Sequence, residues 1–117
     1  MSTIVRHQSN ARLSHAVIHN GVVYLAGTTA DNRGASSKGQ TEEILAKLDA
    51  LLKLSGSSKS RLLSAVVYVA DMRVKPGMDE AWIKWIDPKN PPARATVETR
   101  LGTPETLVEI MVTAAVQ

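Results

Sequence analysis

Arg94 is the residue whose surroundings best suit the binding of an anion. It follows Pro91-Pro92, and two successive prolines restrict the direction in which the chain enters the next segment. A planar guanidinium held on a rigid element can bind a carboxylate or a phosphate through paired N–H donors. We therefore take Arg94 as a candidate anion anchor. The alternative is an arginine that lies on the surface or pairs with Glu98 or Glu109 for structure.

Glu109 interrupts one of the most apolar stretches of the chain, Leu-Val-Glu-Ile-Met-Val at 107–112. An ionised carboxylate is costly to bury in such a segment unless it is paired. A desolvated carboxyl group also suits a general base or a group that orients water. Glu109 is thus the second candidate for a site, and a buried structural ion pair is the alternative.

The remaining candidates carry weaker signals. His15 comes just before an expected hairpin, and Trp85 stands near the end of an expected helix, where it could line a cleft. His7 and His19 have no carboxylate or histidine at the spacing of metal ligands, so we expect no metal site. The sequence contains no cysteine, which excludes disulfides, thiolate zinc sites and a cysteine nucleophile.

The composition is that of a globular domain without a nucleic-acid or membrane signature. The 117 residues, 44% hydrophobic and 21% charged, fit a single domain spanning 1–117. The formal net charge is only +3 and the basic residues are scattered, so nucleic acid is not the expected partner. The sequence has neither the apolar segment of a signal peptide nor a run near the roughly 20 residues of a membrane helix. The expected location is the cytoplasm.

The first elements that must position these residues are two strands. Asn20-Gly21 stands between two β-rich runs, and this dipeptide favours a tight hairpin because both of its residues tolerate positive φ. We therefore predict antiparallel strands over 13–18 and 22–26. The glycine- and serine-rich stretch 27–39 reads as a loop.

A helix is predicted over 41–55 from one apolar stripe of isoleucine and leucine. Thr41 or Gln40 is the expected N-cap, and Gly56 is placed to end the helix in the left-handed region. The rest of the chain predicts strands over 61–71, 93–101 and 107–116, and a second helix, opened by Pro-Gly, over 78–86.

The resulting order, ββαβαββ, indicates an α+β fold in which both helices cover one face of a single mixed sheet. The other face of these valine-rich strands is then left uncovered. A second copy of the chain is the simplest cover, in a closed cyclic assembly. A dimer and a trimer are not separable on this ground.

The C-terminal third of the chain carries a family signature. The motif Asn-Pro-Pro-Ala-Arg-Ala-Thr-Val-Glu at 90–98, followed by Leu-Val-Glu-Ile at 107–110, resembles the Rid family of reactive-intermediate (enamine/imine) deaminases. These proteins are also called YjgF-like or endoribonuclease L-PSP proteins. The resemblance continues through 23–27, 67–72 and the helix with Trp82, so it covers essentially the whole chain.

The resemblance implies a chorismate-mutase-like fold and a homotrimer with clefts between neighbouring subunits. The arginine matching Arg94 holds the substrate carboxylate in deaminases of the family, and the glutamate matching Glu109 helps to position the attacking water. The implied reaction hydrolyses 2-iminoacids, formed from 2-aminoacrylate-type enamines, to 2-ketoacids and ammonia. No cofactor is implied, because an imine is already electrophilic. His15, Ala26, Gly27 and Trp85 are the expected further contacts of the substrate.

Several positions depart from the family pattern. A tyrosine expected before the hairpin is absent from the stretch Leu13-Ser14-His15. The serine before the family's Gly-Gln pair is replaced by Ala26, which Gly27 and Thr28 follow, and a cysteine common just beyond the arginine is absent. The chain is therefore either a deaminase with another side-chain preference or a non-catalytic, chaperone-like or carboxylate-binding member. A ribonuclease is less favoured, because the positive charge is weak and unclustered.

Overall fold

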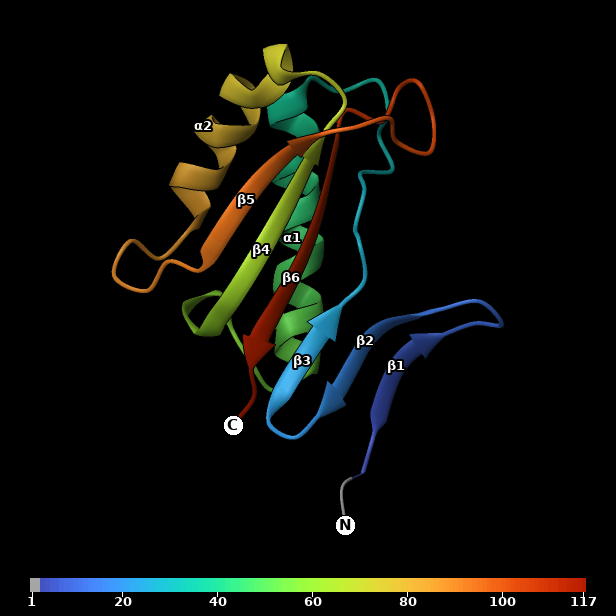
Figure 1. Cartoon of the computed structure of the whole chain (residues 1–117), viewed down its shortest axis with the longest axis vertical. Helices are drawn as coiled ribbons and strands as arrows, with labels where there is room; N and C mark the ends of the chain where they lie inside the picture. The colour runs from blue at the N-terminus through green and yellow to red at the C-terminus, as the bar shows by residue number, and fades with distance from the viewer. Residues whose placement is uncertain (1–2) are drawn as a thin grey trace.

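Alternating apolar residues build one sheet, and two amphipathic helices cover one of its faces (Figure 1). The computed structural model describes residues 3–117. In chain order the elements are β1 (Val5–Ser9), β2 (Ser14–His19), β3 (Val22–Leu25), α1 (Ser37–Leu54), β4 (Leu62–Val69), α2 (Lys75–Trp85), β5 (Ala93–Glu98) and β6 (Val108–Ala115), with short 3-10 turns at Lys59–Arg61 and Met72–Val74. The strand order is β1-β2-β3-β6-β4-β5. The β4–β5 pair is parallel, because α2 crosses between these strands, and the other neighbouring pairs are antiparallel.

The predicted hairpin is confirmed. Asn20 and Gly21 connect β2 to β3 with φ values of 51° and 77°, the left-handed pair that a type I′ turn requires. The mixed sheet, the two helices and the α+β class are likewise as predicted.

The predicted number of strands is wrong, because residues 3–117 contain a sixth strand, and the order is βββαβαββ. β1 is an edge strand that pairs with β2 from Val5 opposite Ile18 to Ser9 opposite Ser14. Most of its side chains are exposed. Its backbone hydrogen bonds hold it in place, so it needs no alternating apolar pattern, and that pattern is the signal that a sequence offers for a strand.

Helix α1 begins earlier than predicted. Its N-cap is Ser36, whose hydroxyl accepts a hydrogen bond from the Gly39 N–H, so the prediction of a cap at Thr41 or Gln40 is wrong. Both of those residues are buried inside the helix. The prediction for the other end is confirmed, because Gly56 has a φ of 79°. The second helix also begins early, at Lys75, since Pro76 in the first turn needs no hydrogen-bond acceptor.

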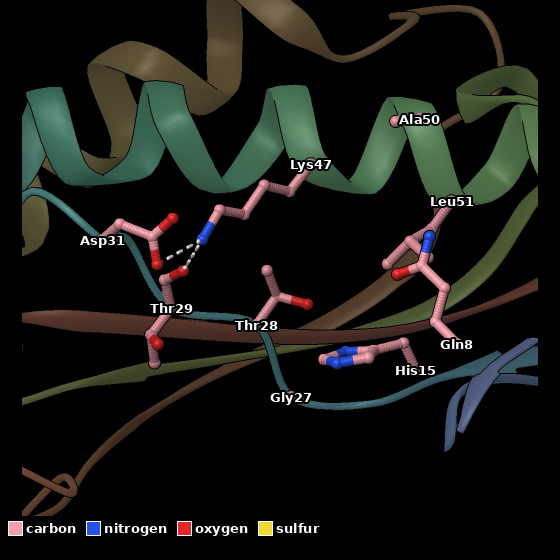
Figure 2. A pocket seen from close by; sticks show the side chains of 9 residues that line it. All are labelled: Gln8, His15, Gly27, Thr28, Thr29, Asp31, Lys47, Ala50 and Leu51. Carbon is pink, nitrogen blue, oxygen red and sulfur yellow. Dashed lines mark hydrogen bonds and ion pairs between the residues drawn. The ribbon is translucent and has the colours of Figure 1, made fainter. Parts of the chain in front are cut away.

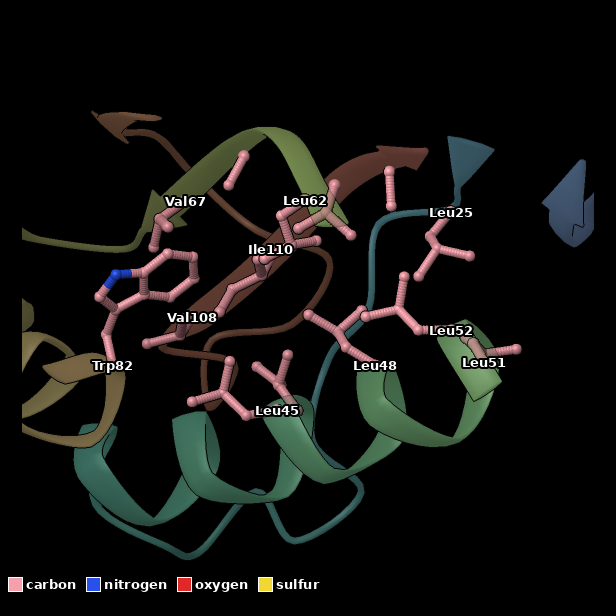
Figure 3. Close-up of a cluster of buried hydrophobic side chains, with 14 of the residues drawn as sticks. Leu25, Leu45, Leu48, Leu51, Leu52, Leu62, Val67, Trp82, Val108 and Ile110 are labelled. Carbon is pink, nitrogen blue, oxygen red and sulfur yellow. The ribbon is translucent and has the colours of Figure 1, made fainter. Parts of the chain in front are cut away.

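The core lies between the sheet and the helices (Figure 3). Buried aliphatic side chains come from alternate positions of β4 and β6 and from one stripe of each helix. Leu45 and Leu48 of α1 and Trp82 of α2 pack against Val67, Val108 and Ile110. Leucine, valine and isoleucine fill an interior that contains no phenylalanine.

The other side of the sheet, called the open face below, faces the viewer in Figure 1, with α1 behind the strands. The strand register places the following side chains on it: Tyr24, Val66, Tyr68, Ala95, Val97, Glu109, Met111 and Thr113. Tyr24 is 50% exposed, and Val97 and Met111 are each 40% exposed. Within residues 3–117 the open face is thus a largely apolar surface exposed to solvent.

Neither helix of this part of the chain is long and apolar enough to span a bilayer.

Gln40 ties two loops to α1. It is fully buried, and its amide nitrogen donates to the carbonyls of Ala35 (3.1 Å) and Glu105 (3.0 Å). Its amide oxygen accepts from the Leu107 N–H at 3.0 Å. One side chain therefore fixes both the entry to α1 and the approach to β6.

Replacing Gln40 by leucine should destabilise the fold. The volume is similar, but buried carbonyl and N–H groups lose their partner, and we expect a loss of about 2–4 kcal/mol in the free energy of unfolding. Urea denaturation measures it. Glu42→Leu, at an exposed position of the same helix, is the control and should change stability by less than about 0.5 kcal/mol. Equal stability of the two variants would contradict this role.

Candidate functional site

Arg94 lies on β5, the edge strand beside β4. It stands opposite Ala65 of β4, whose side chain is buried under the helices, so the Arg94 side chain points to the helix-covered face. That side chain is 24% exposed. The predicted anchor is therefore held near the rim of the sheet, partly buried and still accessible.

Three residues from the middle of α2 hold the guanidinium. Nη2 donates to Oδ1 of Asp79 at 3.1 Å, Nη1 contacts the sulfur of Met78 at 4.0 Å, and the group lies 5.2 Å from the centre of the Trp82 ring. The structural alternative raised above, a pairing with Glu98 or Glu109, is not what the chain does. Glu98 instead accepts from the Met72 N–H at 2.8 Å.

Lys75 shares the same carboxylate. Lys75 precedes Asp79 by one helical turn, and its ammonium lies 2.5 Å from Oδ2 of Asp79. Lys75 and Arg94 therefore share one carboxylate. Burial raises the pKa of Asp79, but the hydrogen bonds from Lys75 and Arg94 outweigh it and lower that pKa below the usual value. The cluster of Lys75, Asp79 and Arg94 keeps an excess of positive charge, which suits an anionic ligand.

Glu109 lies on the open face, opposite Tyr68 in the β4–β6 register. Its carboxylate packs over Gly27, where a Cβ atom would overlap Oε2. Within residues 3–117 it has no hydrogen bond or ion pair, so the buried structural ion pair considered above is not formed within the chain. A half-buried carboxylate without a partner is available to accept a hydrogen bond from water or a ligand.

The structure does not bring Arg94 and Glu109 together within one chain. Arg94 is in register with Ala65 and Val112 on the helix-covered face, whereas Glu109 is in register with Tyr68 on the open face. Side chains that alternate along a strand cannot meet through the sheet. Within one chain the two residues therefore lie on different faces of the sheet.

His15 and Gly27 lie together beside a hollow of about 430 Å³ under α1 (Figure 2). Thr28 and Lys47 also line it. Ala26 precedes this group, and its N–H donates to the carbonyl of His15 at 3.0 Å. Three of the predicted substrate contacts are thus neighbours, although they come from β2 and from the segment after β3.

Lys47 is the cation of this hollow, and the protein already neutralises it. Its ammonium lies 3.1 Å from Asp31 and 3.3 Å from Glu43, and it donates to the carbonyl of Thr29 at 2.9 Å. Figure 2 shows Lys47 reaching across to the segment after β3. These contacts close the segment onto α1 and leave little charge for an anion.

Trp85 lies in a separate hollow between the two helices. Its indole N–H donates to Asp49 of α1 at 2.9 Å, and its ring is 5.5 Å from that of Trp82. It therefore reaches Arg94 only through Trp82. Residues 3–117 contain no group of three His, Asp or Glu side chains that could hold a metal ion.

The residues that hold Arg94 were not among the predicted site residues. Asp79 and Trp82 are three positions apart on α2, and Lys75 precedes Asp79 by four, which are the spacings of helix neighbours. These spacings predict that the three residues share one face of α2. They do not predict that β5 lies against that face.

Known proteins resemble this chain along almost its entire length. The family model described as Endoribonuclease L-PSP matches residues 3–116. A RutC family protein of Haemophilus ducreyi is 39% identical over 97% of both chains. The RutC family protein YoaB of Escherichia coli K12 is 40% identical, over 97% of this chain and 99% of YoaB.

Solved structures agree with the sequences. A member of the YjgF protein family from Neisseria meningitidis superposes with a TM-score of 0.95 at 38% identity, covering 98% of this chain and 96% of that one. A member of the YjgF/YER057c/UK114 family from Mycobacterium tuberculosis has a TM-score of 0.84 at 26% identity, over 99% and 100% of the two chains. Sequence and fold together show that this chain belongs to the YjgF/RutC/endoribonuclease L-PSP family, also called the Rid family.

Proposed function

We propose that the protein is an enamine/imine deaminase that hydrolyses 2-iminoacids to 2-ketoacids and ammonia. The observation that carries the proposal is that the chain exposes a cationic group and an anionic group that do not bind each other. A guanidinium with uncommitted N–H donors lies at the sheet rim, and an unpaired carboxylate lies on the open face. Membership of a family in which many proteins are imine deaminases adds to it.

The proposed active site lies between neighbouring copies in a homotrimer. Arg94 of one copy and Glu109 of the next would face the same cleft, which solves the separation of these residues on the two faces of one sheet. Apolar side chains on the open face, such as Val97 and Met111, supply a surface that association would bury. The cleft would be complete only in the assembly.

Each residue then has a distinct role. Arg94 binds the substrate carboxylate and so fixes the position of the neighbouring imine carbon. Glu109 accepts a hydrogen bond from a water molecule and directs its oxygen at that carbon. The water oxygen bonds to the imine carbon as the π bond of C=N breaks, and one proton of the water passes to the nitrogen. The hydroxyl proton of this tetrahedral intermediate then also passes to the nitrogen, and the C–N bond breaks as C=O forms and ammonia leaves. The product is a 2-ketoacid whose carboxylate still lies on Arg94.

The wall of the cleft near Ala26 and Gly27, next to the Glu109 carboxylate, sets which substrate side chains fit. His15 and Thr28 line the separate hollow under α1. The replacement of a hydroxyl by the Ala26 methyl group makes this wall less polar than the family pattern. We infer that imines with small apolar side chains are the preferred substrates. Trp85, one ring removed from Arg94, would act on the substrate only through Trp82.

A second candidate is binding of small carboxylates without turnover. The positions that depart from the family pattern favour it, because they lie at His15, Ala26 and Thr28 while Arg94 is retained. In that case a 2-ketoacid stabilises the fold in thermal unfolding, and in-situ iminoacids are not consumed faster than in buffer. Enzymatic release of ammonia excludes this candidate.

Arg94→Ala should lower kcat/KM for iminoacids generated by an amino-acid oxidase by about 100-fold or more, since a charged carboxylate contact is lost from the transition state. Ketoacid and ammonia release are measured across a panel of side chains, and light scattering checks that assembly is unchanged. A wild-type protein that never exceeds the rate in buffer would remove the proposed function.

Mixing inactive variants tests whether the site is shared. Refolding Arg94→Ala and Glu109→Gln chains together in equal amounts should restore about a quarter of wild-type activity, since each mixed cyclic trimer has one cleft with both intact residues. The control mixes Arg94→Ala with the double variant, in which no cleft can be intact. No recovery, with mixed trimers verified by mass, would show that Arg94 of one copy and Glu109 of its neighbour do not complete a common cleft, and would contradict the arrangement.

Gly27→Ala should displace the carboxylate of Glu109 and leave the fold intact. The added Cβ meets the flexible end of that side chain and no backbone, so we expect kcat to fall by about tenfold or more and the unfolding midpoint to shift by less than about 5 °C. Gly102→Ala is the control, because a Cβ there meets nothing within 4 Å. Unchanged kcat in Gly27→Ala would show that the position of Glu109 does not matter.

A further inference from the structure

The cluster around Arg94 contains an acidic group that the proposed reaction does not use. Asp79 contacts the guanidinium through one oxygen and one nitrogen, Oδ1 and Nη2, at 3.1 Å. Its second oxygen is occupied by Lys75 at 2.5 Å. A carboxylate beside a carboxylate-binding arginine could either block the arginine or hold it in place.

The hydrogen-bond geometry indicates that Asp79 holds Arg94 in place and does not block it. A blocking carboxylate would bind two N–H groups along one edge of the guanidinium through both of its oxygens, whereas Asp79 binds one nitrogen through Oδ1 and its Oδ2 contacts Lys75. An arginine has five N–H donors, and within residues 3–117 the only other hydrogen bond of this guanidinium is the weak one from Nη1 to the Met78 sulfur at 4.0 Å. The remaining donors have no partner in residues 3–117 and are free for a ligand.

The charges of the cluster also indicate that Asp79 does not block Arg94. Lys75 offsets the negative charge of Asp79, so a second carboxylate is still attracted to Arg94. Asp79 and Arg94 have side chains that are 26% and 24% exposed, so solvent screens their pairing less than it would on an open surface. Trp82 gives the guanidinium a ring to lie against at 5.2 Å. The side chain is thus fixed from two sides.

We propose that Asp79 is a positioning residue. It holds the Arg94 guanidinium against Trp82, so that the N–H donors are already oriented when a substrate carboxylate binds. The inference rests on the proposed function, because it assigns Arg94 the substrate carboxylate. Lys75 has the supporting part: it neutralises Asp79 and keeps that residue from competing with the substrate.

The test compares Asp79→Ala, Asp79→Asn and the control Glu80→Ala. Glu80 is the next acidic residue on α2, and its nearest cation is Lys38 at 3.6 Å on the surface, so its loss changes the charge equally without touching Arg94. Asp79→Ala should raise KM and the Kd for a 2-ketoacid by about tenfold with a smaller change in kcat. Asp79→Asn, which keeps an oxygen acceptor for Nη2, should recover most of the affinity, and Glu80→Ala should match wild type.

A readout independent of catalysis accompanies the kinetics. The ¹⁵N relaxation of the Arg94 Nε–H group should show a more mobile side chain in Asp79→Ala than in wild type or Glu80→Ala. Two results overturn the inference: Asp79→Ala binding the 2-ketoacid as tightly as wild type or tighter, or Glu80→Ala matching its losses. These outcomes are distinct from failure of the proposed function, in which Arg94→Ala itself retains activity and ketoacid binding.

Discussion

Because successive side chains of a β-strand point to opposite faces, Arg94 of β5 and Glu109 of β6 lie on different sides of the same sheet. This constraint follows from backbone geometry, and no rotamer change removes it. The helix-covered side gives Arg94 its partners from α2, and the open face leaves Glu109 without one among residues 3–117. In the proposed trimer, a neighbouring chain completes both.

The stability of the single chain comes from the helix-covered face. Burial of leucine, isoleucine and valine under α1 and α2 supplies the core, and Gln40 fixes the loops that lead into α1 and β6. The open face is apolar yet exposed, and Glu109 stands on it beside Gly27. Assembly would bury this face and at the same moment desolvate Glu109, so the same association would stabilise the protein and form its site.

Sequence patterns predicted the elements that have strong local signals. Asn20-Gly21 has the chemistry of its turn, and Gly56 ends α1 as expected. β1 escaped prediction because an exposed edge strand needs only backbone pairing, and its side chains show no alternation. The start of α1 was not predicted, because its N-cap, Ser36, lies in a stretch whose glycine and serine content is typical of a loop.

The candidate site divides in the same way. Arg94 and Glu109 stood out because each breaks a local pattern, one after two prolines and the other inside an apolar strand. Asp79, Trp82 and Lys75 did not, since their role depends on β5 lying against α2, a contact between elements that periodicity does not position. Trp85 was a reasonable candidate from its place near the helix end, but its N–H is bound to Asp49 instead.

A crystal structure of the assembled protein with a bound 2-ketoacid would show whether Arg94 and Glu109 share a cleft between neighbouring copies. We expect the ligand carboxylate to lie within hydrogen-bond distance of Arg94 in one copy and the keto carbon to face Glu109 of a neighbouring copy. We also expect Asp79 to remain in contact with the same guanidinium. A ligand bound within a single chain, for example beside Lys47 under α1, or an assembly that keeps Arg94 and Glu109 in separate clefts, would contradict this arrangement.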